Sequence, residues 1–275
     1  MIYWKKLEEK PYPPLAEFSR SVAADGCVLL KNDNSVLPLS PEKKVSVFGR
    51  TQIDYYKSGT GSGGLVHTLY TVNIIDGMLA NGKISVNTDL VKIYRDWIKE
   101  NPFDNGHGWA TEPWCQREMV PSAEIVEAAR EKSDTAVIVI GRTAGEDRDN
   151  SEEKGSWYLT DEEEALIDVV SRHFDNTVAV LNVGNIIDMN WVEKYNIKSV
   201  LYVWQGGQEG GNAVADVLSG DVNPSGRLSD TIAYSISDYP SYNCFGGKQF
   251  NLYQEDIYVG YRYFETFAKD KVMYP

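Results

Sequence analysis

The feature that most constrains the fold is the alternation of continuous apolar segments with amphipathic helical patterns between residues 122 and 219. An apolar segment without polar alternation is buried on both faces, and between helices it is typical of a parallel strand. The predicted strands are 135–140, 177–183 and 199–203, and the predicted helices are 122–132, 160–174 and 209–219. This pattern predicts an α/β fold, a three-layer sandwich with a mostly parallel sheet and helices on both faces.

The first half of the chain continues the alternation less regularly. Predicted strands lie at 27–31, 45–48 and 83–86, and predicted helices lie at 15–24, 71–80 and 89–99. Between residues 101 and 121 the pattern lapses into a polar loop that contains His107, Trp109 and Trp114 and is long enough to be functional.

The last part of the chain differs in composition and is rich in Pro, Ser, Tyr and Gly. We expect residues 1–228 to form the α/β sandwich domain and residues 229–275 to form an extended arm. A returning strand is predicted at 257–264, IYVGYRYF. Because the sequence stops at VMYP without a cap or charged tail, we expect it to be part of a longer protein.

The net charge of −13 argues against two classes of partner. It would repel phosphate backbones and anionic membrane surfaces, so neither nucleic acid nor a membrane is expected, whereas an uncharged sugar meets no such repulsion. The first ten residues lack the apolar core of a signal peptide, and no run of about 18 apolar residues occurs. The expected location is therefore cytoplasmic.

No cofactor or metal is expected. Cys27, Cys115 and Cys244 show no CxxC or Cys/His spacing, so we predict free thiols. The glycine-rich segment SGTGSGG at 58–64 contains the GxGxxG pattern of dinucleotide-binding loops. However, eight residues separate it from the preceding strand region, and no acid occurs at 79–84. The pattern favours a loop whose glycines and Ser62 hydroxyl approach a ligand or a partner domain.

A strand-loop-helix unit at 137–167 carries the strongest chemical signal. Its apolar strand leads into Gly145-Glu146, and ligands of open α/β sheets bind beyond the carboxyl ends of strands, so Glu146 is the first candidate for chemistry. Thr160 and Glu163 have the spacing of a capping box at the start of the following helix. Taken by its charge alone, this acidic loop is more typical of a solvated surface loop.

Five segments, in order, resemble the α/β sandwich domain of the glycoside hydrolase family 3 β-glucosidases. They are AADGCVLLKNDNSVLPL at 23–39, SGTGSGG at 58–64, VIGRTAGEDRDN with YLTDEEEALI within 139–167, WQGGQEGGNAVADVLSGDVNPSGRL at 204–228 and IYVGYRYF at 257–264. The loop 101–121 is the part least similar to the family.

The resemblance implies a retaining hydrolase acting on a β-glucoside or cello-oligosaccharide. It assigns the catalytic acid/base to Glu146, with Glu152 and Glu153 as alternatives because this loop varies. It also places Ser62, with Gly61 and Gly63, at the sugar-binding subsite. The family's nucleophilic aspartate lies on a TIM-barrel domain in a Ser-Asp-Trp motif that does not occur in these 275 residues.

Met1 lies about 20 residues before the first family motif. This spacing resembles permuted family members, in which the sandwich precedes the barrel, and we expect a fibronectin-like domain and a barrel to follow. Two other functions stay open: a non-catalytic carbohydrate-binding or interaction domain, and a nucleotide-dependent enzyme. The sugar, its linkage and the presence of a homo-oligomer are not predicted.

Overall fold

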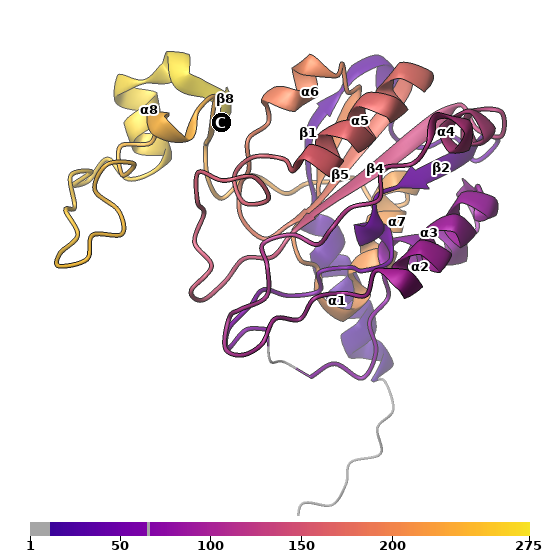
Figure 1. Ribbon diagram of the computed structural model, residues 1–275, viewed down its shortest axis with the longest axis horizontal. Helices are drawn as coiled ribbons and strands as arrows, with labels where there is room; N and C mark the ends of the chain where they lie inside the picture. Colours follow the sequence, from indigo (N-terminus) through magenta and orange to yellow (C-terminus); the bar gives the residue numbers. More distant parts are fainter. Residues whose placement is uncertain (1–11, 65–66) are drawn as a thin grey trace, which may run out of the picture.

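A six-stranded sheet forms the middle layer of the computed structural model, which describes residues 12–64 and 67–275 (Figure 1). Its strands, in the order β1-β6-β5-β4-β2-β3, are Val28–Asn32, Ser199–Tyr202, Asn176–Val183, Thr135–Arg142, Lys44–Phe48 and Ser85–Val86. Only β1 runs antiparallel to its neighbour, β6, and the other pairs are parallel. The predicted, mostly parallel sheet is confirmed.

The central strand β4 is buried along its whole length and contributes to two apolar cores. Ala136, Ile138 and Ile140 belong to the core on one face, and Val137 and Val139 belong to the core on the other. Because successive strand residues point to opposite faces, a strand that lies between two cores is apolar on both faces, as β4 is over residues 136–140. This burial on both faces explains the continuous apolar runs in the sequence.

Helices cover both faces of the sheet, as predicted. Their bounds are α1 Pro13–Asp25, α2 Ile74–Ala80, α3 Thr88–Glu100, α4 Ala123–Arg130, α5 Asp161–His173, α6 Asn190–Lys194 and α7 Gly210–Ser219. Residues of α4, α5 and α6 pack in one core, residues of α1, α2 and α7 pack in the other, and α3 contributes to both (Figure 1). The helix α6 has only five residues, too few for its periodicity to be recognised in the sequence.

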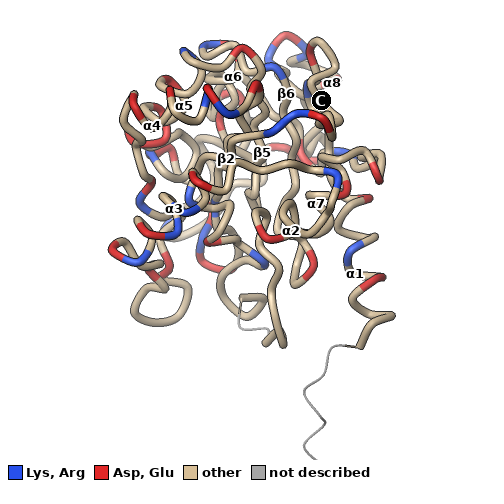
Figure 2. Tube along the Cα trace, turned by 90° about the vertical axis from the view of Figure 1, so that its right-hand side faces the viewer, with Lys and Arg blue, Asp and Glu red and all other residues tan. Residues whose placement is uncertain are grey.

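Short 3₁₀ helices occur at Asp33–Ser35, Arg50–Gln52, Gly207–Glu209, Ile236–Asp238 and Lys269–Lys271. Within the described ranges no helix is long and apolar enough to cross a membrane. Acidic and basic residues are intermixed over the trace (Figure 2). The start of the chain, where the sequence predicts no signal peptide, lies outside the described residues.

The arm contains a helix where the sequence predicts a strand. Residues 257–260 are irregular, and α8 spans Tyr261–Phe267, so the predicted strand at 257–264 is wrong. The backbone at Gly260, with φ 60° and ψ −129°, breaks an extended path, and helical spacing buries Phe264 and Ala268 together. The returning strand is β8, Val272–Tyr274, which pairs antiparallel with β7, Ile232–Ala233.

Candidate active site

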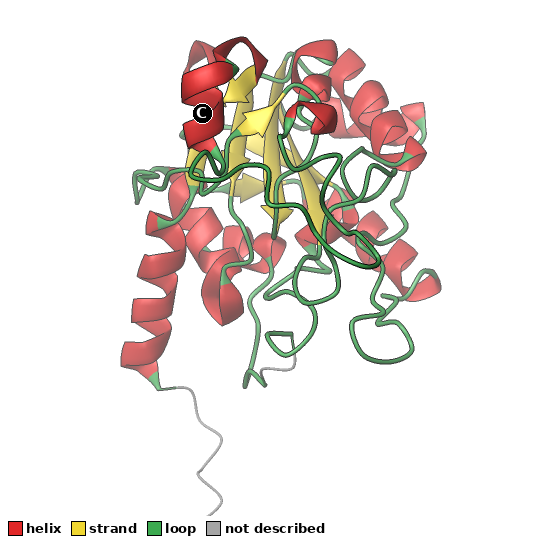
Figure 3. Ribbon diagram, turned by 90° about the vertical axis from the view of Figure 1, so that its left-hand side faces the viewer, coloured by secondary structure: helices red, strands yellow, loops and turns green. Residues whose placement is uncertain are grey.

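The long loops gather at one end of the sheet, beyond the carboxyl ends of the parallel strands (Figure 3). The glycine-rich loop follows β2, and the acidic loop, residues 143–160, follows β4. Among the described residues, the next helix after the glycine-rich loop is α2, which starts at Ile74. The geometry therefore differs from that of a dinucleotide-binding loop, which leads into the first turn of a helix.

Arg142, the last residue of β4, fixes the base of the acidic loop. Its buried guanidinium forms two hydrogen bonds of 2.5 and 2.6 Å with the carboxylate of Glu163. It also donates to the carbonyl of Tyr158 at 3.3 Å. Glu163 in turn completes the predicted capping box, because its Oε2 accepts from the Thr160 N–H at 2.8 Å while its own N–H donates to Thr160 Oγ1. One ion pair thus ties together the strand, the loop and α5.

Asn182, in β5, fixes two further loops of the site. Its Oδ1 accepts from the Tyr56 N–H at 2.8 Å, and its Nδ2 donates to the carbonyls of Tyr56 and Trp204 at 3.0 and 2.6 Å. Neither Asn182 nor Arg142 is among the site residues predicted from the sequence. The signal available for both is a hydrogen-bonding side chain at the carboxyl end of an otherwise apolar strand.

The glycine-rich loop pairs with the acidic loop through the backbone. The Thr60 N–H donates to the carbonyl of Ala144 at 2.8 Å, and Thr60 and Gly145 form a parallel bridge. Gly145 has φ +141°, and a Cβ there would lie 2.7 Å from the Thr60 carbonyl oxygen. Only a residue without a side chain allows this approach, which places the residue after Gly145 against the glycine-rich loop.

Glu146 and Ser62, predicted separately, are in contact. Glu146 Oε2 accepts from the Ser62 backbone N–H at 2.9 Å and from the Ser62 hydroxyl at 2.7 Å. These bonds, the backbone one first, lower the pKa of the exposed Glu146 carboxyl because they stabilise its ionised form. Gly61, at φ +72°, lies so close that a Cβ there would be 2.3 Å from Glu146 Cβ.

A hollow of about 480 Å³ surrounds this contact. It is lined by Gly59, Thr60, Ser62, Gly63, Ala144, Gly145, Glu146, Gly184 and Gln205. Among the described residues that line it, Glu146 is the only one with a carboxylate. An exposed carboxylate beside two hydrogen-bond donors in a polar hollow can exchange a proton with a bound ligand.

The two alternative acids lie in the same loop but do not line this hollow. Glu152 accepts hydrogen bonds from Tyr242 of the arm at 2.5 Å and from Tyr158 at 3.4 Å. Glu153 accepts from the Ser151 hydroxyl at 3.0 Å. The three cysteines are free, as predicted.

Comparison with known proteins finds the same domain in β-glucosidases. A model of the glycosyl hydrolase family 3 C-terminal domain matches residues 27–261. The β-glucosidase of Ruminococcus albus is 51% identical over 94% of this chain, which covers 27% of that protein. β-Glucosidase A of Butyrivibrio fibrisolvens is 36% identical over 100% of this chain, which covers 37% of that protein.

Solved structures show the same similarity. A β-glucosidase from Paenibacillus barengoltzii superposes with a TM-score of 0.94 at 56% identity, over 97% of this chain and 29% of that one. β-Glucosidase 3B from Thermotoga neapolitana, in complex with α-D-glucose, superposes with a TM-score of 0.85 at 36% identity, over 95% of this chain and 37% of that one. The chain thus spans between a quarter and two fifths of the length of these relatives, and it belongs to the glycosyl hydrolase family 3 C-terminal domain family.

Proposed function

We propose that this chain supplies the general acid/base of a retaining β-glucosidase, and that Glu146 is that residue. The observation that carries the proposal is the contact between Glu146 and Ser62 at the carboxyl end of the sheet. The relatives named as β-glucosidases, which are up to 56% identical to this chain over the aligned residues, support the same activity. The substrate is then a terminal β-D-glucoside such as a cello-oligosaccharide.

The mechanism requires a second carboxylate. Retaining hydrolysis uses two carboxyl groups about 5–5.5 Å apart, one as nucleophile and one as acid/base. Glu146 is the only carboxylate lining the hollow among the described residues. We infer that the nucleophile is supplied by a TIM-barrel domain of the complete protein, which faces this hollow.

In the first step, the Glu146 carboxyl gives its proton to the glycosidic oxygen while the nucleophile attacks the anomeric carbon and the bond to the leaving group breaks. In the second step, the Glu146 carboxylate takes a proton from water, and the resulting hydroxide displaces the nucleophile. Each step restores the protonation state that the other one needs.

The lowered pKa of Glu146 suits the second step better than the first, because a general acid must be protonated before it can act. Burying a carboxyl group against a second domain removes water and raises its pKa, and a neighbouring carboxylate raises it further. We infer that covering by the barrel and substrate raises the pKa of Glu146 into the range of a general acid. The free chain, which lacks that cover, holds Glu146 ionised through Ser62.

The test is a comparison of Glu146→Ala, Glu152→Ala and Glu153→Ala in the complete protein. Glu146→Ala should lower turnover of methyl β-D-glucoside by about 10²–10⁴-fold, because its leaving group needs a proton. Turnover of a dinitrophenyl glucoside should fall less, and azide should restore part of it by attacking the glycosyl intermediate. The other two variants should keep most activity, and azide rescue of either one in place of Glu146→Ala would move the assignment.

The alternative, a carbohydrate-binding module, makes a different prediction for the isolated chain. A half-site should show no turnover and only weak binding of glucose. Tight binding of glucose or cello-oligosaccharide in calorimetry, without the rest of the protein, would favour the module. The permuted domain order remains an expectation, which the coding sequence flanking these 275 residues will test.

A further inference from the structure

A second hollow lies beside the first, under the loop of residues 101–121. It has a volume of about 290 Å³ and is bounded by this loop on one side and the glycine-rich loop on the other. The loop is held in shape at its base, where the Gln116 side chain bonds both the N–H and the carbonyl of Asp104, at 2.7 and 3.0 Å. The carbonyl of Trp114 accepts from the Thr143 N–H at 2.8 Å, which fastens the loop to the end of β4.

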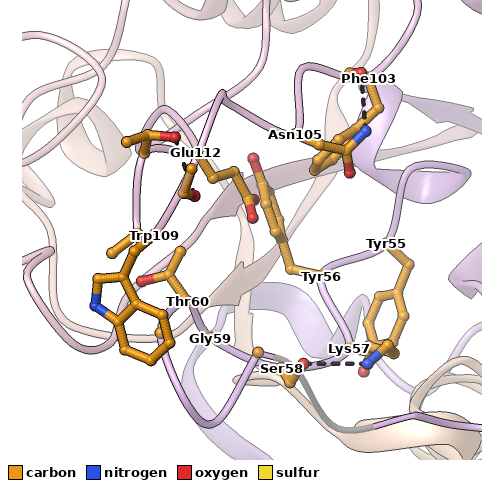
Figure 4. A pocket seen from close by; sticks show the side chains of 15 residues that line it. Tyr55, Tyr56, Lys57, Ser58, Gly59, Thr60, Phe103, Asn105, Trp109 and Glu112 are labelled. Carbon is orange, nitrogen blue, oxygen red and sulfur yellow. Dashed lines mark hydrogen bonds between the residues drawn. The ribbon is translucent and has the colours of Figure 1, made fainter.

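Two polar side chains in this hollow have no hydrogen-bond partner among the described residues. The hydroxyl of Tyr56, a side chain only 4% exposed, is buried without a partner. The half-buried carboxylate of Glu112 accepts no hydrogen bond from a described residue, and burial raises its pKa to about 7. Figure 4 shows the ring of Tyr56 with its hydroxyl end on the side of Glu112. The Glu112 carboxylate lines the hollow, so a hydroxyl group of a bound ligand can donate a hydrogen bond to it.

Trp109 gives the hollow an aromatic wall. The residue is 52% exposed, and Figure 4 shows its indole beside Thr60. An exposed indole next to polar groups matches a pyranose ring, which has apolar C–H faces and hydroxyl edges. The acidic character of the chain and the Glu112 carboxylate disfavour a phosphate-bearing ligand.

The two hollows share the backbone of Gly59 and Thr60, which line both. A ligand whose reacting bond lies at Glu146 can therefore extend over this backbone towards Trp109. We propose that the second hollow binds the leaving-group sugar of an oligosaccharide substrate. In this arrangement Trp109 stacks on the sugar ring, and Glu112 accepts hydrogen bonds from the hydroxyl groups of that sugar. This inference rests on the proposed function of Glu146.

The test compares two substrates that share the glucosyl unit but differ in the leaving group, cellobiose and methyl β-D-glucoside. In the complete protein, Trp109→Ala should lower kcat/KM for cellobiose by on the order of 10-fold and leave that for methyl β-D-glucoside nearly unchanged. Glu112→Gln should also lower the ratio of kcat/KM for cellobiose to kcat/KM for methyl β-D-glucoside. Phe18→Ala removes an aromatic ring that is 65% exposed on α1, outside both hollows, and should leave the ratio unchanged.

An equal loss on both substrates, or an unchanged ratio, would overturn the assignment of this hollow while Glu146 keeps its role. Binding gives a readout that does not depend on turnover. In calorimetry, the double variant Glu146→Ala/Trp109→Ala should bind cellobiose about 10-fold more weakly than Glu146→Ala alone. Equal affinities would exclude the hollow as a sugar site even if the protein hydrolysed no glucoside. Full activity of Glu146→Ala on methyl β-D-glucoside would instead reject only the proposed role of Glu146.

Discussion

Replacing Gly61 with Ala should displace Glu146 without disturbing the sheet. A Cβ on Gly61 would lie 2.3 Å from Glu146 Cβ and 2.8 Å from Glu146 Oε2. Carbon atoms in contact are ordinarily about 3.5–4.0 Å apart, so one of the two residues must move by more than about 1 Å. Gly61 also has φ +72°, a conformation that costs a residue with a Cβ roughly 1–2 kcal/mol.

Two other glycines separate the backbone strain from the clash. Gly82 has φ +75° and nothing within 4 Å of its Cβ position, so Gly82→Ala carries the strain without the clash. Gly63→Ala carries neither, because its Cβ meets nothing within 4 Å and its φ is not in the left-handed region. In urea unfolding, Gly61→Ala and Gly82→Ala should each lower the free energy of unfolding by about 1–2 kcal/mol. The free energy of unfolding of Gly63→Ala should stay within about 0.5 kcal/mol of the wild-type value.

Activity then distinguishes Gly61 from Gly82. A shift of about 1 Å in a reacting group can cost on the order of 10²-fold in rate, so Gly61→Ala should reduce kcat/KM of the complete protein by about that factor. Gly82→Ala, in the turn between α2 and β3, should keep wild-type kcat/KM. If the two variants were equally active, the contact between Gly61 and Glu146 would not position the catalytic carboxyl.

Three further predictions concern charged groups. Arg142→Met leaves the buried Glu163 carboxylate unpaired and should lower the free energy of unfolding by about 3–5 kcal/mol; a loss below about 1 kcal/mol in urea unfolding would contradict this. Ser62→Ala removes one of two donors to ionised Glu146, so NMR titration should find a higher pKa for that carboxyl; an unchanged value would count against the hydrogen bond. Burial raises the pKa of Glu118 from 4.5 to about 8, so its neutral form is favoured in the fold. The resulting stability is present below pH 4.5, and the free energy of unfolding falls by about 1.4 kcal/mol per pH unit as the pH rises to 8. Glu118→Gln should remove this slope from a plot of the free energy of unfolding against pH. An unchanged slope in this variant would refute the assignment to Glu118.

The local sequence pattern is sufficient to predict a helix or strand where the whole segment lies in one kind of environment. The strand β4 was predicted from its continuous apolar run because both of its faces are buried. The start of α5 was predicted because the Thr160–Glu163 capping box is made within four residues. The prediction of a strand at 257–264 is wrong because aromatic and β-branched residues favour a strand only where another strand is available for pairing. Within residues 12–64 and 67–275 the segment has no such partner, and helical spacing buries Phe264 instead.

The sequence by itself determined the fold class and named Glu146 and Ser62 as separate candidates, since periodicity and motifs are local properties of the chain. Only the tertiary structure decided that these two residues, 84 positions apart, touch through two hydrogen bonds. It also decided that Arg142 and Asn182 hold the loops and that the 101–121 loop forms a second hollow beside the first. These features depend on how parallel strands bring the ends of distant segments to one edge of the sheet, which no local pattern records.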